Sequence, residues 1–448
     1  MKVPQQPPDL KTLLENPRIF EHWDEIFSAV RRLVPSWKYL HWDKLRRLPV
    51  RDGFSHEDLW MRMKIQRNAA ARQIPLWDKR ERNFRYCVPD SVAAQLHEID
   101  IGAGGTIGMP EQITNPQTRD QYVVRSLMEE AITSSQLEGA VTTRQVAKEM
   151  IRSGRAPRDR SERMILNNFA TMRKITEIRD QPLTRDLVFS IHRLVTEGTL
   201  SDESAAGRFR RADEEITVQD EYGEVFHDPP AAGELEARMT AMCEFANAQT
   251  PEQFLHPVLR AIILHFWLAY DHPFVDGNGR TARALFYWSM LRQRYWLFEF
   301  ISISDILLKA PAKYARAFLY VETDDNDLTY FIIHQTEVIR RAVVGLHAYI
   351  EEKSKELRQT EALLRHAAQL NHRQEGLLSH ALRHPDARYT IEGHRLSHAV
   401  AYDTARNDLL DLHRLEFLDM KKSGKALVFF AKPDLSARIS NTMKSHAP

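Results

Sequence analysis

The sequence predicts a mainly α-helical protein of about three domains, and three observations support this fold class. The chain has 448 residues, and a domain usually holds about 150. Apolar residues recur at helical spacing over 122–137, 187–195, 258–270 and 282–297. Alternating, β-prone runs flank a polar turn at two places, residues 215–227 and 416–431. We therefore expect helical domains that carry small β-hairpins.

Bulk composition is that of an ordinary globular protein and indicates no class of partner. Apolar residues make up 43% of the chain, and 62 Lys and Arg face 61 Asp and Glu, for a formal net charge of +1. This balance argues against a polyanion-binding surface over the whole chain. The two cysteines, Cys87 and Cys243, have neither metal-ligand nor disulfide-framework spacing.

No segment of the sequence predicts a membrane partner. The most apolar stretch, 261–270, is shorter than the ~20 residues that span a bilayer. The N-terminus lacks the apolar core and cleavage pattern of a signal peptide. We therefore expect a soluble, cytoplasmic protein.

Changes in pattern along the chain predict three domains. Residues 1–116 form a tryptophan- and arginine-rich helical N-terminal domain, residues 117–353 a helical core, and residues 354–448 a linker helix with a third domain. The third domain should hold helices at 374–382, 390–398 and 403–415, followed by the hairpin 416–431. Three helices and a hairpin in this order are typical of a winged helix-turn-helix.

The charge of the third domain gives weak support for DNA as a partner. From Glu361 onward, 13 Lys and Arg face 10 Asp and Glu, a surplus of 3, whereas nucleic-acid binding usually needs a more basic surface. Lys421, Lys422 and Lys425 on the expected wing favour DNA. DNA binding and a protein-packing role both stay open.

The segment Asp271 to Arg283, DHPFVDGNGRTAR, has the composition of an anion-binding loop between two helices. An apolar helix should end at Tyr270, before Pro273, and a second helix should start near 278–281. Glycines beside the free N–H groups of a helix start form a site for anions. Two arginines in the first turn, Arg280 and Arg283, add fork-shaped donors.

Two flanking side chains complete a set of reactive groups. His272 can accept a proton near neutral pH. Asp276 offers the hard oxygen ligand that Mg²⁺ shares with phosphates. A base, a metal carboxylate and an anion site together describe in-line attack of a hydroxyl on a nucleotide phosphate.

Residues His272 to Arg283 resemble the Fic family motif, HPFx(D/E)GNGRxxR, at every fixed position. The resemblance implies a helical Fic core that transfers AMP from ATP to a Ser, Thr or Tyr hydroxyl of a protein. It implies His272 as the general base, Asp276 as the Mg²⁺ ligand and Arg283 as the γ-phosphate ligand. It implies that the α- and β-phosphates contact Gly277, Asn278, Gly279 and Arg280.

The resemblance also distinguishes AMP transfer from phosphate transfer and implies which molecules the chain binds. A Doc-type kinase has lysine where this chain has Gly279, so the chain looks like an AMP transferase. The implied partners are ATP and a target protein with an accessible hydroxyl; self-modification and a homodimer stay open.

An upstream segment, EEAITSSQLEGA over 129–140, resembles the inhibitory Fic motif (S/T)xxxE(G/N). Ser134 and Glu138 are spaced to share one helical face, and Gly139 is a common helix stop. From the residues alone, a solvated helix end fits as well. The resemblance implies that Glu138 pairs with Arg283 and obstructs the γ-phosphate, as in Fic proteins with an N-terminal inhibitory helix. It also leaves open that Glu138 serves removal of AMP.

The hairpin 215–227 lies where Fic proteins carry a flap that pairs with an extended target segment. Ile216, Thr217 and Val218 would then position the target by strand addition. Upstream, Gly207 to Arg210 resembles the family's GxxR sequence. A purely structural hairpin stays open.

A second class of function also remains. A winged-helix, DNA-binding regulator could bind nucleotide in its Fic core without turnover. The intact His272 favours the enzyme, since a core without turnover does not need the base.

Overall fold

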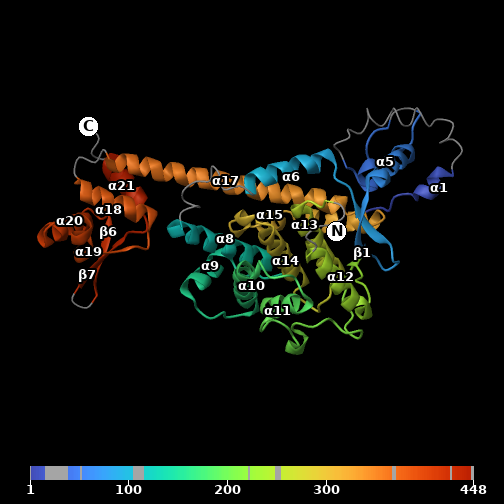
Figure 1. Ribbon diagram of the computed structural model, residues 1–448, viewed down its shortest axis with the longest axis horizontal. Helices are drawn as coiled ribbons and strands as arrows, with labels where there is room; N and C mark the ends of the chain where they lie inside the picture. Colours follow the sequence, from blue (N-terminus) through green and yellow to red (C-terminus); the bar gives the residue numbers. More distant parts are fainter. Residues whose placement is uncertain are drawn as a thin grey trace. The chain divides into compact units, whose positions relative to one another are not determined.

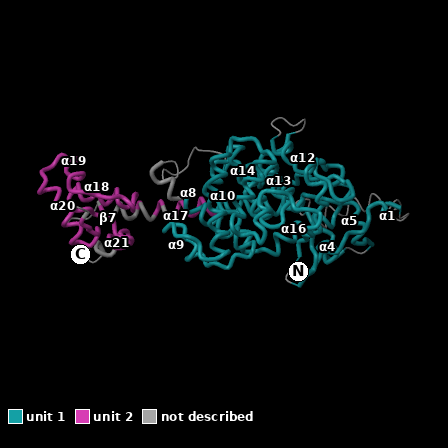
Figure 2. The backbone as a smooth tube through the Cα atoms, turned by 90° about the horizontal axis from the view of Figure 1, so that it is seen from below, with its two compact units in different colours: residues 1–105, 123–344 teal, residues 106–122, 345–448 magenta. Residues whose placement is uncertain are grey.

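The structure is a computed structural model, and it describes residues 2–15, 39–50, 53–103, 116–219, 222–247, 254–365, 370–423 and 426–444. Contacts divide the chain into two compact units (Figure 2). The first holds residues 1–105 and 123–344, and the second holds residues 106–122 and 345–448. The domain boundaries expected after residues 116 and 353 stay predictions. None of the helices in the described ranges is long and apolar enough to cross a bilayer.

The first unit is mainly helical, as expected (Figure 1). Its N-terminal elements are α1 (Leu10–Leu14), α4 (Trp42–Leu45), α5 (His56–Ala70), β1 (Arg72–Trp77), β2 (Asn83–Tyr86) and α6 (Asp90–Ala103). Then follow α8 (Pro116–Leu137) from residue 123 onward, α9 (Arg144–Ser153), α10 (Arg160–Ile178), α11 (Arg185–Thr196), β3 (Val218–Gln219), β4 (Val225–His227) and α12 (Leu235–Asn247). The last are α13 (Pro257–Asp271), α14 (Asn278–Arg292), α15 (Ser304–Leu308), α16 (Pro311–Thr323) and the start of α17 (Thr329–Arg365).

Helices α13 and α14 form the centre of the first unit. They pack against each other, and nearly every side chain of both is buried. Proline at the first position, Pro257, fits the start of α13. The helical segment expected at 282–297 is too long, because α14 ends at Arg292 and Arg294 turns the chain with φ of 66°.

A hairpin in the N-terminal part was not predicted. Strands β1 and β2 pair antiparallel, and Ile74 and Leu76 point into the core from alternate positions of β1. Pro75 between them interrupts the pattern of a strand, because proline removes a ladder hydrogen bond. Strand β1 packs on α12, so the N-terminal part contributes more than helices.

The second unit has the expected order of three helices and a hairpin. It contains α18 (His372–Arg383), β5 (Arg388–Thr390), α19 (Ile391–His398), α20 (Tyr402–Arg414), β6 (Leu418–Ser423), β7 (Ala426–Ala431) and α21 (Leu435–Lys444). The sheet has the antiparallel order β5-β7-β6. Strand β5 was missed because three residues carry too little pattern. The assignment as a winged helix-turn-helix stays a prediction.

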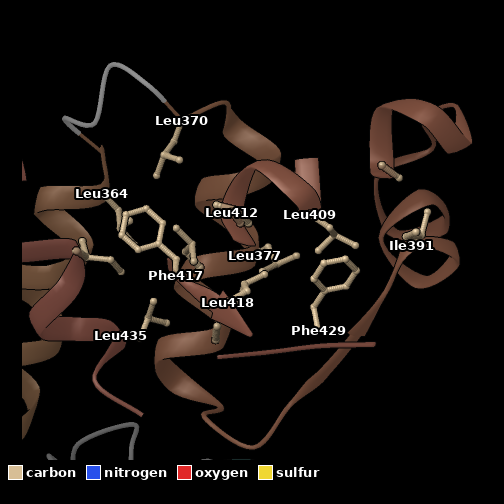
Figure 3. Close-up of a cluster of buried hydrophobic side chains, with 14 residues drawn as sticks. Leu364, Leu370, Leu377, Ile391, Leu409, Leu412, Phe417, Leu418, Phe429 and Leu435 are labelled. Carbon is tan, nitrogen blue, oxygen red and sulfur yellow. The ribbon is translucent and has the colours of Figure 1, made fainter. Parts of the chain in front are cut away.

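One hydrophobic core holds the second unit together. Side chains from its helices and strands meet in a single cluster, which includes Leu377, Leu409, Leu412, Phe417 and Phe429 (Figure 3). One acidic residue of α20, Asp408, faces inward, where it accepts hydrogen bonds from Asn371 and Arg373. Asp408 therefore contributes its negative charge to an internal ion pair with Arg373 and not to the solvent-facing side of α20.

Candidate active site

A six-residue loop joins α13 to α14, and two residues of left-handed backbone shape it. His272 has φ of 45° and ψ of 55°, and Gly277 has φ of 82°. The Asn278 side chain ties the loop together: its Oδ1 accepts from the Phe274 N–H at 3.0 Å, and its Nδ2 donates to the Phe274 carbonyl at 2.8 Å. The Asn278 side chain therefore serves the loop itself.

The His272 ring is arranged as a base. Its Nδ1 lies 3.2 Å from the Ala269 carbonyl, and a carbonyl can only accept, so Nδ1 carries the proton and Nε2 is the free basic nitrogen. Burial, followed by the positive charge of His227, lowers the pKa of His272 to about 4. The ring is therefore neutral, and able to take a proton, throughout the physiological pH range.

The start of α14 has the features of an anion site and lacks a side-chain cap. Helices α9, α10 and α11 begin with a side chain that accepts from their first backbone N–H groups. Helix α14 begins with Gly277 and has no such side-chain cap. Its first N–H groups are therefore available to an anion, and the helix dipole adds favourable potential there.

The two motif arginines have different surroundings. Arg280 is fully buried beneath the loop, where Nη1 donates to the Val195 carbonyl at 3.0 Å and Nη2 lies 3.4 Å from Asp276 Oδ1. Its Nε is buried and has no hydrogen-bond partner within the described ranges. Arg283 instead faces α8. Arg280 thus holds the loop in place, whereas Arg283 contacts Ser134 and Glu138 on and just after α8.

Asp276 fits a metal ion that is shared with a ligand. Its Oδ2 accepts from Arg160 Nη2 at 2.8 Å, and its Oδ1 accepts from the Gly277 N–H at 2.5 Å. No group of three or more His, Cys, Asp and Glu residues with metal-site geometry occurs within the described ranges. One carboxylate suits Mg²⁺, which usually binds proteins through one or two carboxylates and takes its other ligands from phosphates and water.

The predicted inhibitory residues meet Arg283. Arg283 Nη2 donates to Glu138 Oε1 at 2.8 Å and to the Ser134 carbonyl at 3.0 Å, while Nε donates to Ser134 Oγ at 2.8 Å. The Arg283 side chain is 2% exposed and that of Glu138 is 27% exposed. Burial alone would lower the pKa of Arg283, but the Glu138 carboxylate, together with Tyr314 and Glu130, outweighs burial and raises this pKa.

Glu138 also lies on the open start of α14. A methyl group built on Gly279 would come within 2.1 Å of Glu138 Oε1. The carboxylate therefore lies directly over Gly279, where an anion bound to the helix start would lie. Gly139, with φ of 89°, ends the segment as expected.

Helix α8 is anchored two turns earlier by a buried carboxylate that sequence reasoning missed. Glu130 is 1% exposed. Its Oε2 accepts from Tyr287 and Ser302 at 2.8 Å each, and its Oε1 accepts from the Ser304 hydroxyl at 2.5 Å. Four donors, counting the Ser304 N–H at 3.1 Å, satisfy the charge and fix α8 against α14.

Replacing Glu130 by glutamine should destabilise the first unit by about 1–3 kcal/mol, because an amide group would face hydroxyl and N–H donors that then lack acceptors. Urea unfolding followed by tryptophan fluorescence measures this, since all eight tryptophans belong to the first unit. Glu129→Gln is the matched control: Glu129 pairs with Arg144 and Lys148 near the surface and should cost less than about 1 kcal/mol. Equal losses in the two variants would contradict the anchoring role.

The hairpin beside the site forms as expected. Strands β3 and β4 pair antiparallel, with Val218 opposite His227, while Ile216 and Thr217 lie just before β3. We call residues 216–227 the flap. Arg210, the last residue of the GxxR sequence, donates from Nε to the His272 carbonyl at 2.9 Å and from Nη2 to the Pro230 carbonyl. The GxxR segment thus links the base to the chain that follows the flap.

A buried histidine that sequence reasoning missed, His192, supports the loop from α11. Its Nδ1 accepts from the Gly207 N–H at 2.9 Å, so its Nε2 carries the proton and donates to the Asp276 carbonyl at 2.8 Å. The ring stacks on Phe274 with centroids 3.8 Å apart. Burial lowers its pKa to about 4, which keeps this neutral tautomer in place. A lone histidine on an apolar helix face carries no sequence signal for this role.

Comparisons with known proteins agree with this geometry. Residues 182–290 match the model of the Fic/DOC family. The chain contains a Fic domain. The match covers α11 to α14, and hence His192, the GxxR segment, the flap and the motif loop. Glu138 lies outside the matched residues, so its contact with Arg283 is an observation of this structure.

Curated relatives align with the Fic domain over short segments. The protein adenylyltransferase Fic of Nematostella vectensis is 39% identical over 107 residues, which are 24% of this chain and 22% of that protein. The protein of the same name from Drosophila mojavensis is 41% identical over 69 residues, 15% of this chain and 14% of that protein. The chain thus matches less than a quarter of the length of these relatives.

A solved structure shares the fold over a longer range. A Fic family protein from Desulfovibrio desulfuricans superposes with a TM-score of 0.52 at 18% identity. The superposition covers 78% of this chain and 98% of that one. At this identity the likeness shows the fold alone.

Proposed function

We propose that this chain is a protein adenylyltransferase that moves AMP from ATP to a Ser, Thr or Tyr hydroxyl of a target protein. One observation carries the proposal: a neutral His272 base lies beside the uncapped start of α14, so a proton acceptor and an anion site occupy the same loop. The names of the curated relatives support the same activity.

The proposed step needs one base and one anion site. His272 Nε2 takes the proton of the target hydroxyl while its oxygen attacks the α-phosphorus of ATP. The bond from that phosphorus to the bridging oxygen of the β-phosphate breaks, and pyrophosphate leaves. Backbone N–H groups at the start of α14 stabilise the charge that develops on the phosphate oxygens, and they do so without rearranging.

The remaining groups hold the substrates. Mg²⁺ bound at Asp276 would neutralise phosphate charge. Arg283 would bind the γ-phosphate once it is released from Glu138. The flap would hold an extended target segment by strand addition, with Ile216, Thr217 and Val218 as its pairing residues.

We further propose that Glu138 keeps the resting enzyme inhibited. Its carboxylate accepts a hydrogen bond from the Arg283 guanidinium and also fills the space over Gly279. A γ-phosphate at Arg283 would meet a like charge and a filled volume there. Nucleotide in the productive position therefore requires Glu138 to leave.

The position of the label distinguishes the proposed activity from its alternatives. The Glu138→Gly chain is incubated with Mg²⁺, a cell lysate and ATP that carries ³²P at either the α- or the γ-position. AMP transfer labels protein from α-labelled ATP only. Label from γ-labelled ATP only would identify a kinase, and no label from either, together with measurable nucleotide binding, would favour the regulator that binds nucleotide without turnover.

A further inference from the structure

His227, at the end of the flap, lies between two hydrogen-bond acceptors. Its Nδ1 is 2.8 Å from Glu322 Oε2 on α16, and its Nε2 is 2.6 Å from the Tyr270 carbonyl on α13. The side chain is 8% exposed. A carbonyl never donates and a carboxylate does not donate at neutral pH, so both ring nitrogens must carry protons. The geometry is that of an imidazolium ion.

The surroundings of His227 favour this charge. Tyr270 belongs to the last turn of α13, whose free carbonyls attract a cation. Burial alone would lower the pKa of His227, but the Glu322 carboxylate and the Tyr270 carbonyl together outweigh burial and raise it. Lys79, from the turn between β1 and β2, opposes this effect and is the smallest of the named causes. The buried carboxyl of Asp271, paired with Arg238 at 3.0 Å, also faces the pair from α13.

The charge on His227 acts on the base. His272 follows Tyr270 by two residues, and after burial the positive charge of His227 is the largest cause of its lowered pKa. The Glu138 carboxylate acts in the opposite direction. Removing Glu138, whether by mutation or by movement, therefore leaves His227 and, as a smaller contribution, Arg210 as the charges that lower the pKa of the base.

We propose that His227 and Glu322 are positioning residues: the charged pair fastens the second strand of the flap to the C-terminus of α13 and holds the adjacent base neutral. The charge of the pair does not depend on the proposed function, whereas its expected effect on the rate of AMP transfer rests on that function. The pair links target binding, through the flap, to proton transfer, through His272.

The two histidines give the activity opposite pH limits. The pKa of His272 is lowered, so the base is neutral above about pH 4 and is lost by protonation below it. The pKa of His227 is raised above its ordinary value of about 6.5. The flap fastening is therefore complete below about pH 6.5 and weakens as pH rises through the folded pKa.

Histidine NMR tests the charge without any need for activity. The full chain, labelled with ¹³C at histidine Cε1, is titrated without nucleotide, and the two signals are assigned from His227→Gln and His272→Ala. We expect His227 to be protonated at pH 7, and His272 to titrate below pH 5 in wild type and about one pH unit higher in His227→Gln. A neutral His227 at pH 7, or a His272 midpoint that ignores the substitution, would overturn the proposal.

Kinetics in the Glu138→Gly background separate a positioning role from a merely structural one. His227→Gln and Glu322→Gln should both move the acid limit of AMP transfer upward by about one pH unit and raise the KM for the target severalfold. His227→Lys, which keeps the cation at every pH, should keep the low acid limit. Glu236→Gln is the control, because this exposed carboxylate pairs with Arg185, is not among the groups that shift the pKa of either histidine, and should leave the pH limits unchanged.

The outcomes of these experiments are separable. A Glu138→Gly chain that transfers no AMP would count against the proposed function, whereas the NMR result would still decide the charge of His227. Identical acid limits in His227→Gln and His227→Lys would show that packing, not charge, explains the effect, and would overturn the electrostatic role.

Discussion

Glu138→Gly is expected to raise AMP transfer by roughly 10–150-fold. The wild-type carboxylate holds Arg283 through a charge-assisted hydrogen bond of 2.8 Å, and such a bond contributes about 1.5–3 kcal/mol. At about 1.4 kcal/mol per factor of ten, this energy corresponds to the stated range. Initial rates with α-labelled ATP and a fixed target measure it, and the affinity for ATP should rise in parallel because Arg283 and the space over Gly279 become free.

Two substitutions test whether charge and volume both contribute. Glu138→Gln keeps an oxygen that can accept from Arg283 but removes the charge, so its rate should fall between those of wild type and Glu138→Gly. Glu129→Gln removes a carboxylate from the same helix that pairs with Arg144 and Lys148, and it should leave the rate unchanged. No gain in Glu138→Gly, with the fold intact, would remove the inhibitory role.

His272→Ala in the Glu138→Gly background is expected to lower AMP transfer by about 10²–10⁴-fold, the usual contribution of a general base. The loss should lie in kcat, because the ring is placed to accept a proton and not to hold the nucleotide. Calorimetric titration with a non-hydrolysable ATP analogue should therefore give the same affinity with and without the ring. A matching loss of nucleotide affinity would mean that the ring binds the nucleotide or supports the loop.

The sequence predicted the loop between α13 and α14 better than it predicted the residues that hold this loop and α8 in place. A helix that ends at Tyr270 and a second that starts near 278–281 followed from the position of Pro273 and the glycines. The structure has α13 end at Asp271 and α14 begin at Asn278. The contact between Glu138 and Arg283 joins residues 145 apart. Spacing could not predict that contact, which came from the resemblance to a family motif.

The missed features depend on partners distant in sequence. His192 contacts the Asp276 carbonyl 84 residues away, and Glu130 contacts Tyr287 157 residues away. Nothing near either residue distinguishes it from an ordinary helical side chain. Asn278 and Arg280 lie in predicted positions, but their side chains hold the loop itself, because a turn this tight needs its own polar partners.

The left-handed backbone of His272 has a consequence for how the chain can change over time. An L-residue with φ of 45° sits where glycine, which has no Cβ, is more stable by about 1 kcal/mol. Glycine at this position would relieve the backbone strain, but it would also remove the imidazole. Under the proposed function, His272 therefore marks a trade-off between stability and activity, because glycine suits this backbone conformation better but cannot accept a proton.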